Sequence, residues 1–563
     1  MCGLVALAAI LASRPFVEMG LIDDFSYVKT AFLFAKTGHF VFNGWATAML
    51  GAQIVWAAPF IKLLGYSFFA ARVSTVVLAI LCVWVTHAVF RRAGLERWPA
   101  VLGALTLGLS PLFVPMAVSF MTDISGLIAI VACIYCCLRA MESAETRRVV
   151  AWLVLAEIVG LLGGTTRQIA WLTVLVMVPS AAWILRRRRR VLALGVVLWL
   201  LSAAFVAACM EWFKHQPFNV PETLTEGRLD FHGARELMGT MLAALLCLCL
   251  LLMPMLASGL GRWKRIRMRD LAAALAGSLA GFWMCRFVTY HLTEKGLMPW
   301  TGDILDRLDV IGYPNAWFLG VAPAALSRPE RAAGSFLVLF TTAVFVMVLC
   351  RSGGEVRTQR AQGPSWQDLL LLLGPFSAAY LLLLVPRGIW AQILDRYLLP
   401  LLVVGLIFLL RLYQERISPK LPAISWVLLA IFAAFGVLGT HDWIAGHSAR
   451  LEAVRRLHAA GIPSEKIEAG YEFDGVTQIE HDGVVYDPRV SYPAERNIHP
   501  YLPAGISHDC EYLFNPHTPA VHPEFFLAYQ QVRCLQPSRF GSVSYRGWLP
   551  PFHREILILE RSQ

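Results

Sequence analysis

Apolar blocks with almost no charge recur along most of this chain, each close to the length of a membrane-spanning helix. Such blocks predict transmembrane helices, because about 20 apolar residues cross the hydrocarbon core. A shorter apolar run at residues 1–12 is interpreted as the end of a further span, although a cleaved signal peptide is the alternative. The pattern therefore predicts about thirteen helices, twelve of them at 72–90, 98–115, 124–140, 149–164, 169–185, 191–210, 237–258, 271–290, 334–350, 368–386, 397–412 and 421–440.

The loops between these blocks alternate between two kinds. Short basic loops follow every second span, and positive charge is retained on the cytoplasmic side. The basic loops are 91–97, 147–148, 186–190, 262–267, 351–360 and 411–420. The longer loops of mixed charge then lie outside the cytoplasm, and they are 14–70, 116–123, 165–168, 211–236, 291–333, 387–396 and the tail from residue 441. The sequence thus predicts a multi-pass protein of the inner (plasma) membrane with its tail in the periplasm or outside the cell.

Composition agrees with a membrane protein and excludes a nucleic-acid-binding one. Hydrophobic residues make up 57% of the chain, charged residues only 15%, and the mean hydropathy is +0.59. Soluble domains carry about 25% charged residues. The formal net charge of +11 comes largely from the short basic loops, so it reflects topology and not a nucleic-acid surface.

The last 120 or so residues have a different character from the rest. They are rich in Pro, Gly, Tyr and His, with helical spacing at 448–460 and strand-like runs at 484–486 and 555–559. We therefore predict a transmembrane domain over 1–440, with a catalytic first external loop at 14–70, and a small α+β extracytoplasmic domain over 441–563. Cys510 and Cys534 lie in this polar tail, where an oxidising compartment would permit one disulfide between them.

Three carboxylates are candidates for chemistry at the external face. Asp23 and Asp24 are adjacent in the first external loop, and Asp123 lies in a very short loop between two spans. A carboxylate at a membrane margin can deprotonate an acceptor hydroxyl or amine, and charges at this depth are functional hypotheses by default. The structural alternative is that Asp23 and Asp123 are helix N-caps.

Three arginines lie in external loops of the same predicted side. They are Arg167, Arg387 and Arg396, and Arg396 is flanked by Asp395 and Tyr397. Guanidinium groups match phosphate oxygens in a bidentate manner, so carboxylates and arginines at one face suit a phosphate-headed lipid. The alternative for each arginine is an interfacial anchor.

The order of these motifs resembles a known family. The acidic pair Asp23-Asp24 comes first, then the run 68–72 ending in Arg72, then Met121-Thr122-Asp123, and then 395–400 before a late span. This order is similar to that of the GT-C superfamily of membrane glycosyltransferases, and within it to glycosyltransferase family 39, the bacterial protein O-mannosyltransferase and aminoarabinose transferase-like group. The tail around 443–474 also resembles bacterial relatives, and it lacks the β-trefoil insert of eukaryotic mannosyltransferases.

The resemblance implies a fold, a reaction and roles. It implies a GT-C-like helical membrane domain and an inverting transfer of a sugar from a polyprenyl-phosphate donor to an extracytoplasmic lipid, envelope glycan or protein. Asp24 or Asp23 would activate the acceptor with help from Asp123. The family usually has Asp-Glu where this chain has Asp-Asp, so the identity of the base stays open. The donor phosphate would be held by Arg396, Tyr397, Arg167 and Arg387.

No cluster of metal ligands is evident in the sequence, so we predict no cofactor and no metal. A divalent cation between Asp23 and Asp123 is the open alternative, because some GT-C enzymes use one.

Two other classes of protein have the same hydropathy pattern. A transporter or flippase of a lipid-linked sugar would usually show paired repeats and charges near the bilayer midplane. This chain shows no repeat, and its charges gather at one face. A non-catalytic scaffold presenting the tail to a partner would not need the three carboxylates.

Overall fold

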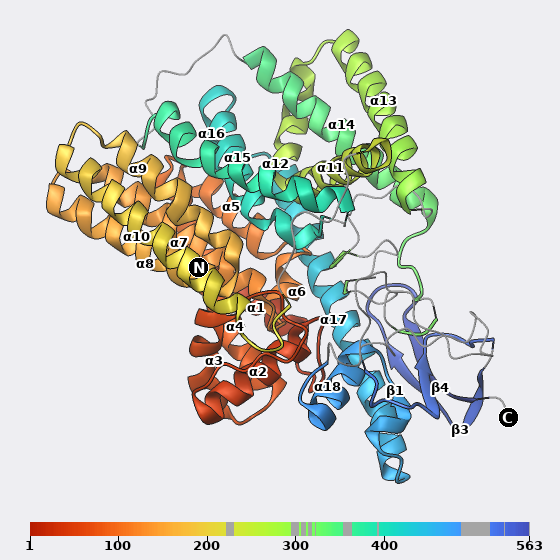
Figure 1. Cartoon of the computed structure of the whole chain (residues 1–563). Coiled ribbons are helices and arrows are strands. Elements are labelled where there is room, and N and C mark those ends of the chain that lie inside the picture. Colours follow the sequence, from red (N-terminus) through yellow and green to blue (C-terminus); the bar gives the residue numbers. More distant parts are fainter. Residues whose placement is uncertain are drawn as a thin grey trace.

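The computed structural model is a mostly helical protein with a small sheet near the C-terminus (Figure 1). It describes residues 1–220, 230–293, 303–305, 311–312, 318–320, 322–352, 363–390, 393–485, 518–533 and 535–561. Within these ranges, nine helices are long and apolar enough to cross a membrane. The predicted multi-pass helical fold with a small C-terminal sheet is confirmed, whereas the number thirteen stays a prediction.

The N-terminal part supplies three short helices before the first long one. The helices of this part are α1 (Cys2–Ala12), α2 (Asp24–Thr37), α3 (Gly51–Leu64), α4 (Phe68–Arg92), α5 (Arg97–Gly108), α6 (Phe113–Ala117), α7 (Thr122–Glu142), α8 (Thr146–Thr166), α9 (Val178–Ile184) and α10 (Arg189–Lys214). A 3₁₀ turn, η1 (Gln168–Trp171), and a π-helical turn, η2 (Thr173–Met177), precede α9.

The second part continues the bundle and adds the sheet. Its helices are α11 (Phe231–Leu251), α12 (Met253–Leu256), α13 (Met268–Thr293), α14 (Arg328–Ser352), α15 (Trp366–Trp390), α16 (Leu399–Arg416), α17 (Ala423–Ala459) and α18 (Tyr471–Asp482). The 3₁₀ segments are η3 (Ala257–Arg265), η4 (Asp395–Leu398) and η5 (Ser464–Lys466). The strands are β1 (Ile467–Glu468), β2 (Phe525–Ala528), β3 (Leu535–Arg546) and β4 (His553–Arg561).

The predicted span at 98–115 is divided in the structure. Residues 98–115 form α5 and α6 instead of one helix, and the break lies at Leu109–Leu112. Pro111 explains the break, because proline has no N–H for the helix ladder and disfavours helical backbone at the residue before it. The broken segment is fully buried, which lets its free backbone groups find partners inside the protein.

The sheet has the order β1-β2-β4-β3, with β1 and β2 parallel and the other pairs antiparallel. It packs against the end of α17 through Ala449, Ala453, Val454 and Leu457. The predicted strand at 555–559 lies within β4, whereas residues 484–485 are not a strand and residue 486 lies outside the described residues. Cys510 and Cys534 also lie outside them, so their disulfide stays a hypothesis.

Helix α17 is continuous across the expected domain boundary at 440/441. It runs for 37 residues, beginning in apolar sequence and ending beside the sheet (Figure 1). The division into 1–440 and 441–563 therefore stays a prediction about function, because no break in the backbone marks it.

Two of the basic loops, 91–97 and 411–420, meet at one end of the bundle. Gln414 accepts a hydrogen bond from the backbone N–H of Glu96 and donates one to the carbonyl of Gly94. Arg411 donates to the carbonyls of Ala93 and Pro364. These contacts join the loops that the charge pattern assigns to the cytoplasm, at the C-terminal end of α4.

Candidate active site

Asp24 is locked into the structure by four hydrogen bonds. Its side chain is fully buried, and it accepts from Nε of Arg72 at 3.0 Å and Nη2 of Arg72 at 3.1 Å. The backbone N–H groups of Leu21 and Phe120 donate to the same carboxylate at 2.6 and 3.0 Å. Arg72 also binds the carbonyls of Val17 and Met19. Asp24 therefore joins the first external loop to α4 and to the loop before α7, and no oxygen is left facing a reactant.

Asp23 lies in a different environment from Asp24, because its side chain is partly exposed and faces Arg396. Asp23 is the N-cap residue of α2, as the structural alternative expected, but its side chain makes no capping hydrogen bond. Nε1 of Trp45 donates to Oδ1 at 2.9 Å, and Oδ2 lies 3.7 Å from Nη2 of Arg396. The side chain keeps 22% of its exposure. Burial raises the pKa of Asp23, and Arg396 and the Trp45 N–H counteract part of that rise.

Asp123 is paired with Arg167. It lies in the first turn of α7, where Met121 is the N-cap residue, so Asp123 is not the cap that the alternative interpretation expected. Oδ1 accepts from Nη1 of Arg167, which also lies 3.4 Å from the hydroxyl of Thr122. Oδ2 is buried and has no hydrogen-bond partner among the described residues. Asp123 thus holds one guanidinium group in place and keeps one oxygen available.

Three guanidinium groups surround the ring of Tyr397. The Cζ atoms of Arg167, Arg387 and Arg396 lie 4.8, 5.1 and 6.0 Å from the ring centroid. Tyr380 fixes this tyrosine, because its hydroxyl donates to the Tyr397 carbonyl at 2.8 Å. Buried Arg396 has no hydrogen-bond partner for Nη1 among the described residues. The four predicted phosphate-binding residues therefore lie together, with carboxylates of the site beside Arg167 and Arg396.

A further carboxylate, Asp303, was not predicted from the sequence. Its Oδ2 lies 3.3 Å from Nε of Arg396, and its side chain is only 6% exposed. Burial raises the pKa of Asp303 to about 8, against the lowering effect of Arg396. Asp395 positions it by accepting hydrogen bonds from the N–H groups of Ile304 and Leu305 at 3.2 and 2.7 Å. Asp303 lies in a long loop of mixed charge, and no local motif distinguishes it there.

The site gathers residues from five loops of one predicted face. They come from 14–70, 116–123, 165–168, 291–333 and 387–396. The N-terminal turns of α4 and α7 carry Arg72 and Asp123 near this site, and both helices end at the basic end of the bundle, where Arg92 binds Glu142. The charge pattern along the sequence and the spatial arrangement therefore agree. The arrangement can hold a phosphate beside a carboxylate that accepts a proton.

The acidic side chains of the site face guanidinium groups. Within the described residues, no three or more His, Cys, Asp or Glu side chains are grouped so as to hold a metal ion. Metal independence stays a prediction, and Asp23 and Asp123 remain the residues to test if a cation is required.

A second set of buried charges lies in the tail. Glu472 accepts from Nη2 of Arg450 at 2.8 Å and contacts Nε2 of His447 at 3.2 Å. Burial raises the pKa of the Glu472 carboxyl, but Arg450 and His447 outweigh it and hold the pKa at about 2. Nearby, burial raises the pKa of Asp474 to about 8, although the Ala469 N–H donates to it.

Asp474→Asn should make the protein more stable above neutral pH. A carboxyl whose pKa is raised from 3.8 to about 8 contributes stability below pH 4 that is lost as pH rises through 8. Asparagine stays neutral and can still accept from the Ala469 N–H. We expect a Tm gain of a few degrees at pH 9 and none at pH 4, measured by thermal unfolding in detergent. Glu480→Gln, at an exposed carboxylate of the same helix, is the control and should show no such pH-dependent gain.

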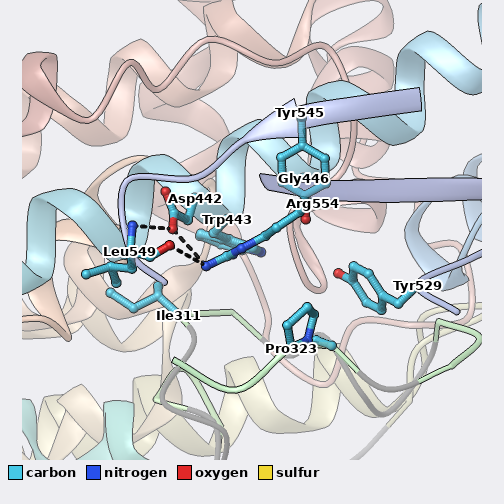
Figure 2. A pocket seen from close by; sticks show the side chains of 11 residues that line it. Ile311, Pro323, Asp442, Trp443, Gly446, Tyr529, Tyr545, Leu549 and Arg554 are labelled. Carbon is cyan, nitrogen blue, oxygen red and sulfur yellow. Dashed lines mark hydrogen bonds and ion pairs between the residues drawn. The ribbon is translucent and has the colours of Figure 1, made fainter. Parts of the chain in front are cut away.

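A separate hollow lies beside α17 and the sheet (Figure 2). Asp442 accepts there from Nη2 of Arg554 at 3.0 Å and from the N–H groups of Trp548 and Leu549 at 2.6 and 3.0 Å. Arg554 also donates to three backbone carbonyls. The charges at this hollow are thus engaged in holding the β3–β4 connection, and none of the predicted site residues lines it.

Comparison with protein families supports the resemblance seen in the sequence. Residues 53–214 match the family model described as dolichyl-phosphate-mannose-protein mannosyltransferase, which is less than a third of the chain. Together with the multi-pass helical fold, the match supports the resemblance to GT-C superfamily membrane glycosyltransferases.

Solved structures of two proteins are similar only at low levels. ArnT from Cupriavidus metallidurans bound to undecaprenyl phosphate is 14% identical, with a TM-score of 0.35, over 82% of this chain and 80% of that one. AglB from Archaeoglobus fulgidus, in complex with an inhibitory peptide and a dolichol-phosphate, is 13% identical, with a TM-score of 0.38, over 81% and 57%. No curated protein matches the chain.

Proposed function

We propose that this protein is a family 39-like glycosyltransferase that moves a sugar from a polyprenyl-phosphate donor to an extracytoplasmic acceptor, with inversion at the anomeric carbon. The observation that carries the proposal is the group of three guanidiniums around Tyr397, beside the partly exposed carboxylate Asp23 and the buried carboxylate Asp303. The matched family model supports a lipid-phosphate donor, because its description names a dolichyl-phosphate sugar.

The donor phosphate would lie among Arg167, Arg387 and Arg396. Phosphate is already a good leaving group, so the main catalytic task is to stabilise charge that develops as the sugar–oxygen bond breaks. Positioned arginines do this without protonating the leaving oxygen. The lipid tail can stay in the bilayer, and α2 and α3 would lie along the interface beside it.

Asp23 would serve as the general base. The acceptor hydroxyl or amine attacks the anomeric carbon from the face opposite the phosphate, its proton passes to Asp23, and polyprenyl phosphate departs with the electron pair of the broken bond. The Trp45 N–H fixes one oxygen of Asp23, and the other faces the site near Arg396. Asp123 would assist by orienting Arg167.

The reaction would take place outside the cytoplasm. The five loops that form the site are those that the positive-inside rule assigns to this side. The tail, which contacts the first of these loops, would then lie in the periplasm. The acceptor would be a lipid, an envelope glycan or a protein, all of which are present there.

A transfer assay tests the proposal. Membranes containing the protein are incubated with a radiolabelled polyprenyl-phosphate sugar and an extract of envelope acceptors. We expect label to move from the donor lipid to an acceptor only when the protein is present. Movement of intact donor across the bilayer without transfer would instead support a flippase. The absence of both transfer and movement would support a scaffold.

Transfer should not depend on an added metal. In the proposed site, arginines stabilise the developing phosphate charge, so EDTA should leave the initial rate within about twofold of its untreated value. The assay is repeated after dialysis against EDTA, with and without Mg²⁺ or Mn²⁺. A large loss that a divalent ion restores would contradict the prediction and direct attention to Asp23 and Asp123.

A further inference from the structure

Among the described residues of the tail, Tyr471, the first residue of α18, lies beside Trp45, which binds Asp23. We propose that Tyr471 is a positioning residue that holds Trp45, and through Trp45 the carboxylate of Asp23, so that the tail is a working part of the catalytic site. This inference rests on the proposed function and adds to it a role for a region more than 400 residues distant in sequence from the first external loop.

Three aromatic rings connect the tail to Asp23. The Tyr471 ring meets the ring of Phe25 edge-on at 5.8 Å and lies 6.3 Å from that of Trp45. Phe25 and Trp45 are themselves 5.7 Å apart. Trp45 donates its indole N–H to Asp23 at 2.9 Å. The direction of that N–H is therefore set by a ring cluster to which the tail contributes one of the three members.

Tyr471 is mounted rigidly in the tail. It follows Gly470, whose φ of +91° favours glycine, and precedes Glu472, which is bound to Arg450 and His447 of α17. Arg450 also donates to the carbonyl of Ala469. The tyrosine is thus held from both sides by buried groups, and a buried, fully paired network of this kind is stiff.

The first loop and the tail are also closely fitted to each other. A Cβ atom placed on Gly475 of α18 would lie 2.4 Å from Cε2 of Phe25. One placed on Gly20 would lie 3.0 Å from Cβ of Glu472. Glycine at both positions permits this close approach, and larger residues would separate the loop from α18.

Loss of the Trp45 hydrogen bond should change how Asp23 titrates. An N–H donor stabilises the charged carboxylate, so its removal raises the pKa of Asp23 and moves the acidic limb of the kcat/KM profile to higher pH. Other charges around Asp23 stay in place in such a variant. The titratable and charged groups that face it are Asp24, Tyr27, Asp123, Asp303, Arg387, Arg396 and Tyr471 itself.

The experiment compares five variants of the whole chain in the transfer assay, one of them a control. Trp45→Phe removes the N–H donor but keeps a ring, and Tyr471→Leu removes the ring that supports it. The third variant combines both changes, and Tyr471→Phe keeps the ring without the hydroxyl. Tyr545→Leu, in β3 at the hollow of Figure 2, is the matched control for a tyrosine lost elsewhere in the tail. Folding of each variant is checked by its Tm in detergent.

We expect Tyr471→Leu to lower kcat/KM at neutral pH by about 10- to 100-fold and to move the acidic limb upward. Trp45→Phe should give the same shift, and the double variant should be no worse than the stronger single one, because both changes remove one interaction. Tyr471→Phe, which keeps the ring, should retain most of the activity of the unaltered protein. Tyr545→Leu should leave the profile unchanged.

Additive losses, or a Tyr471→Leu profile whose acidic limb does not move, would overturn the inference. Such results require that the unaltered protein transfers sugar. If the unaltered protein shows no transfer, the proposed function itself has failed, so the two failures are distinguishable.

Discussion

Asp23→Asn should lower sugar transfer by about 10²- to 10⁴-fold and leave the fold intact, because it removes the general base while Arg396 keeps its contact with Asp303. Asparagine can still accept from the Trp45 N–H, so the loop should keep its conformation. The measurement is the initial rate of transfer under saturating donor, together with the Tm in detergent. Full activity in this variant would eliminate Asp23 as the base.

The neighbouring change, Asp24→Asn, provides the comparison. It weakens a bidentate pair in which both side chains are at most 4% exposed, and it leaves the charge of Arg72 buried. Breaking such a pair costs about 3 to 5 kcal/mol of stability. We therefore expect a lower Tm and poor membrane yield for Asp24→Asn, whereas Asp23→Asn keeps both. Inactive, well-folded Asp24→Asn protein would reverse the two roles.

Arg396→Gln should lower transfer by about 10²- to 10³-fold, because one positioned cation at the leaving phosphate is lost. The effect should fall on kcat more than on KM if the contact strengthens as the phosphate leaves. Arg396 also faces Asp23 and Asp303, so its removal should further favour the protonated form of both. Steady-state kinetics with varied donor concentration measures both parameters.

Arg92→Gln is the control for Arg396→Gln. Arg92 lies at the basic end of the bundle, where it pairs with Glu142, and it is outside the site. Its loss should leave kcat and KM unchanged. Equal losses from both changes would show that general destabilisation, and not phosphate contact, explains the Arg396 effect.

Much of the fold follows from the sequence because lipid imposes a simple requirement. Every backbone polar group in the bilayer must be paired within the protein, which makes long apolar segments helical. The prediction of one continuous helix fails at Pro111, where the break is buried inside the protein. The tail was harder to predict, because its sheet depends on contacts between residues 467–468 and 525–528 that no local pattern reveals.

The site was predictable to the level of its loops and not of its atoms. The charge pattern placed Asp23, Asp123, Arg167 and Arg396 on one face, and they do lie together. It could not separate Asp23 from Asp24, because successive residues at the start of a helix differ by about 100° in direction. The positions of Arg72 and of the Leu21 and Phe120 N–H groups decide which carboxylate is locked. Asp303 depends on the fold of a long loop and on the distant anchor Asp395.

The unbroken course of α17 has a mechanical consequence. At 1.5 Å per residue, its 37 residues extend for about 55 Å, whereas the hydrocarbon core is only about 30 Å thick. Roughly half of this helix therefore projects beyond the lipid. Any tilt imposed by bilayer thickness displaces its C-terminal end. Arg450 lies on the projecting half and binds the segment that carries Tyr471. A thicker or thinner bilayer should therefore change the geometry of the catalytic site without any change in sequence.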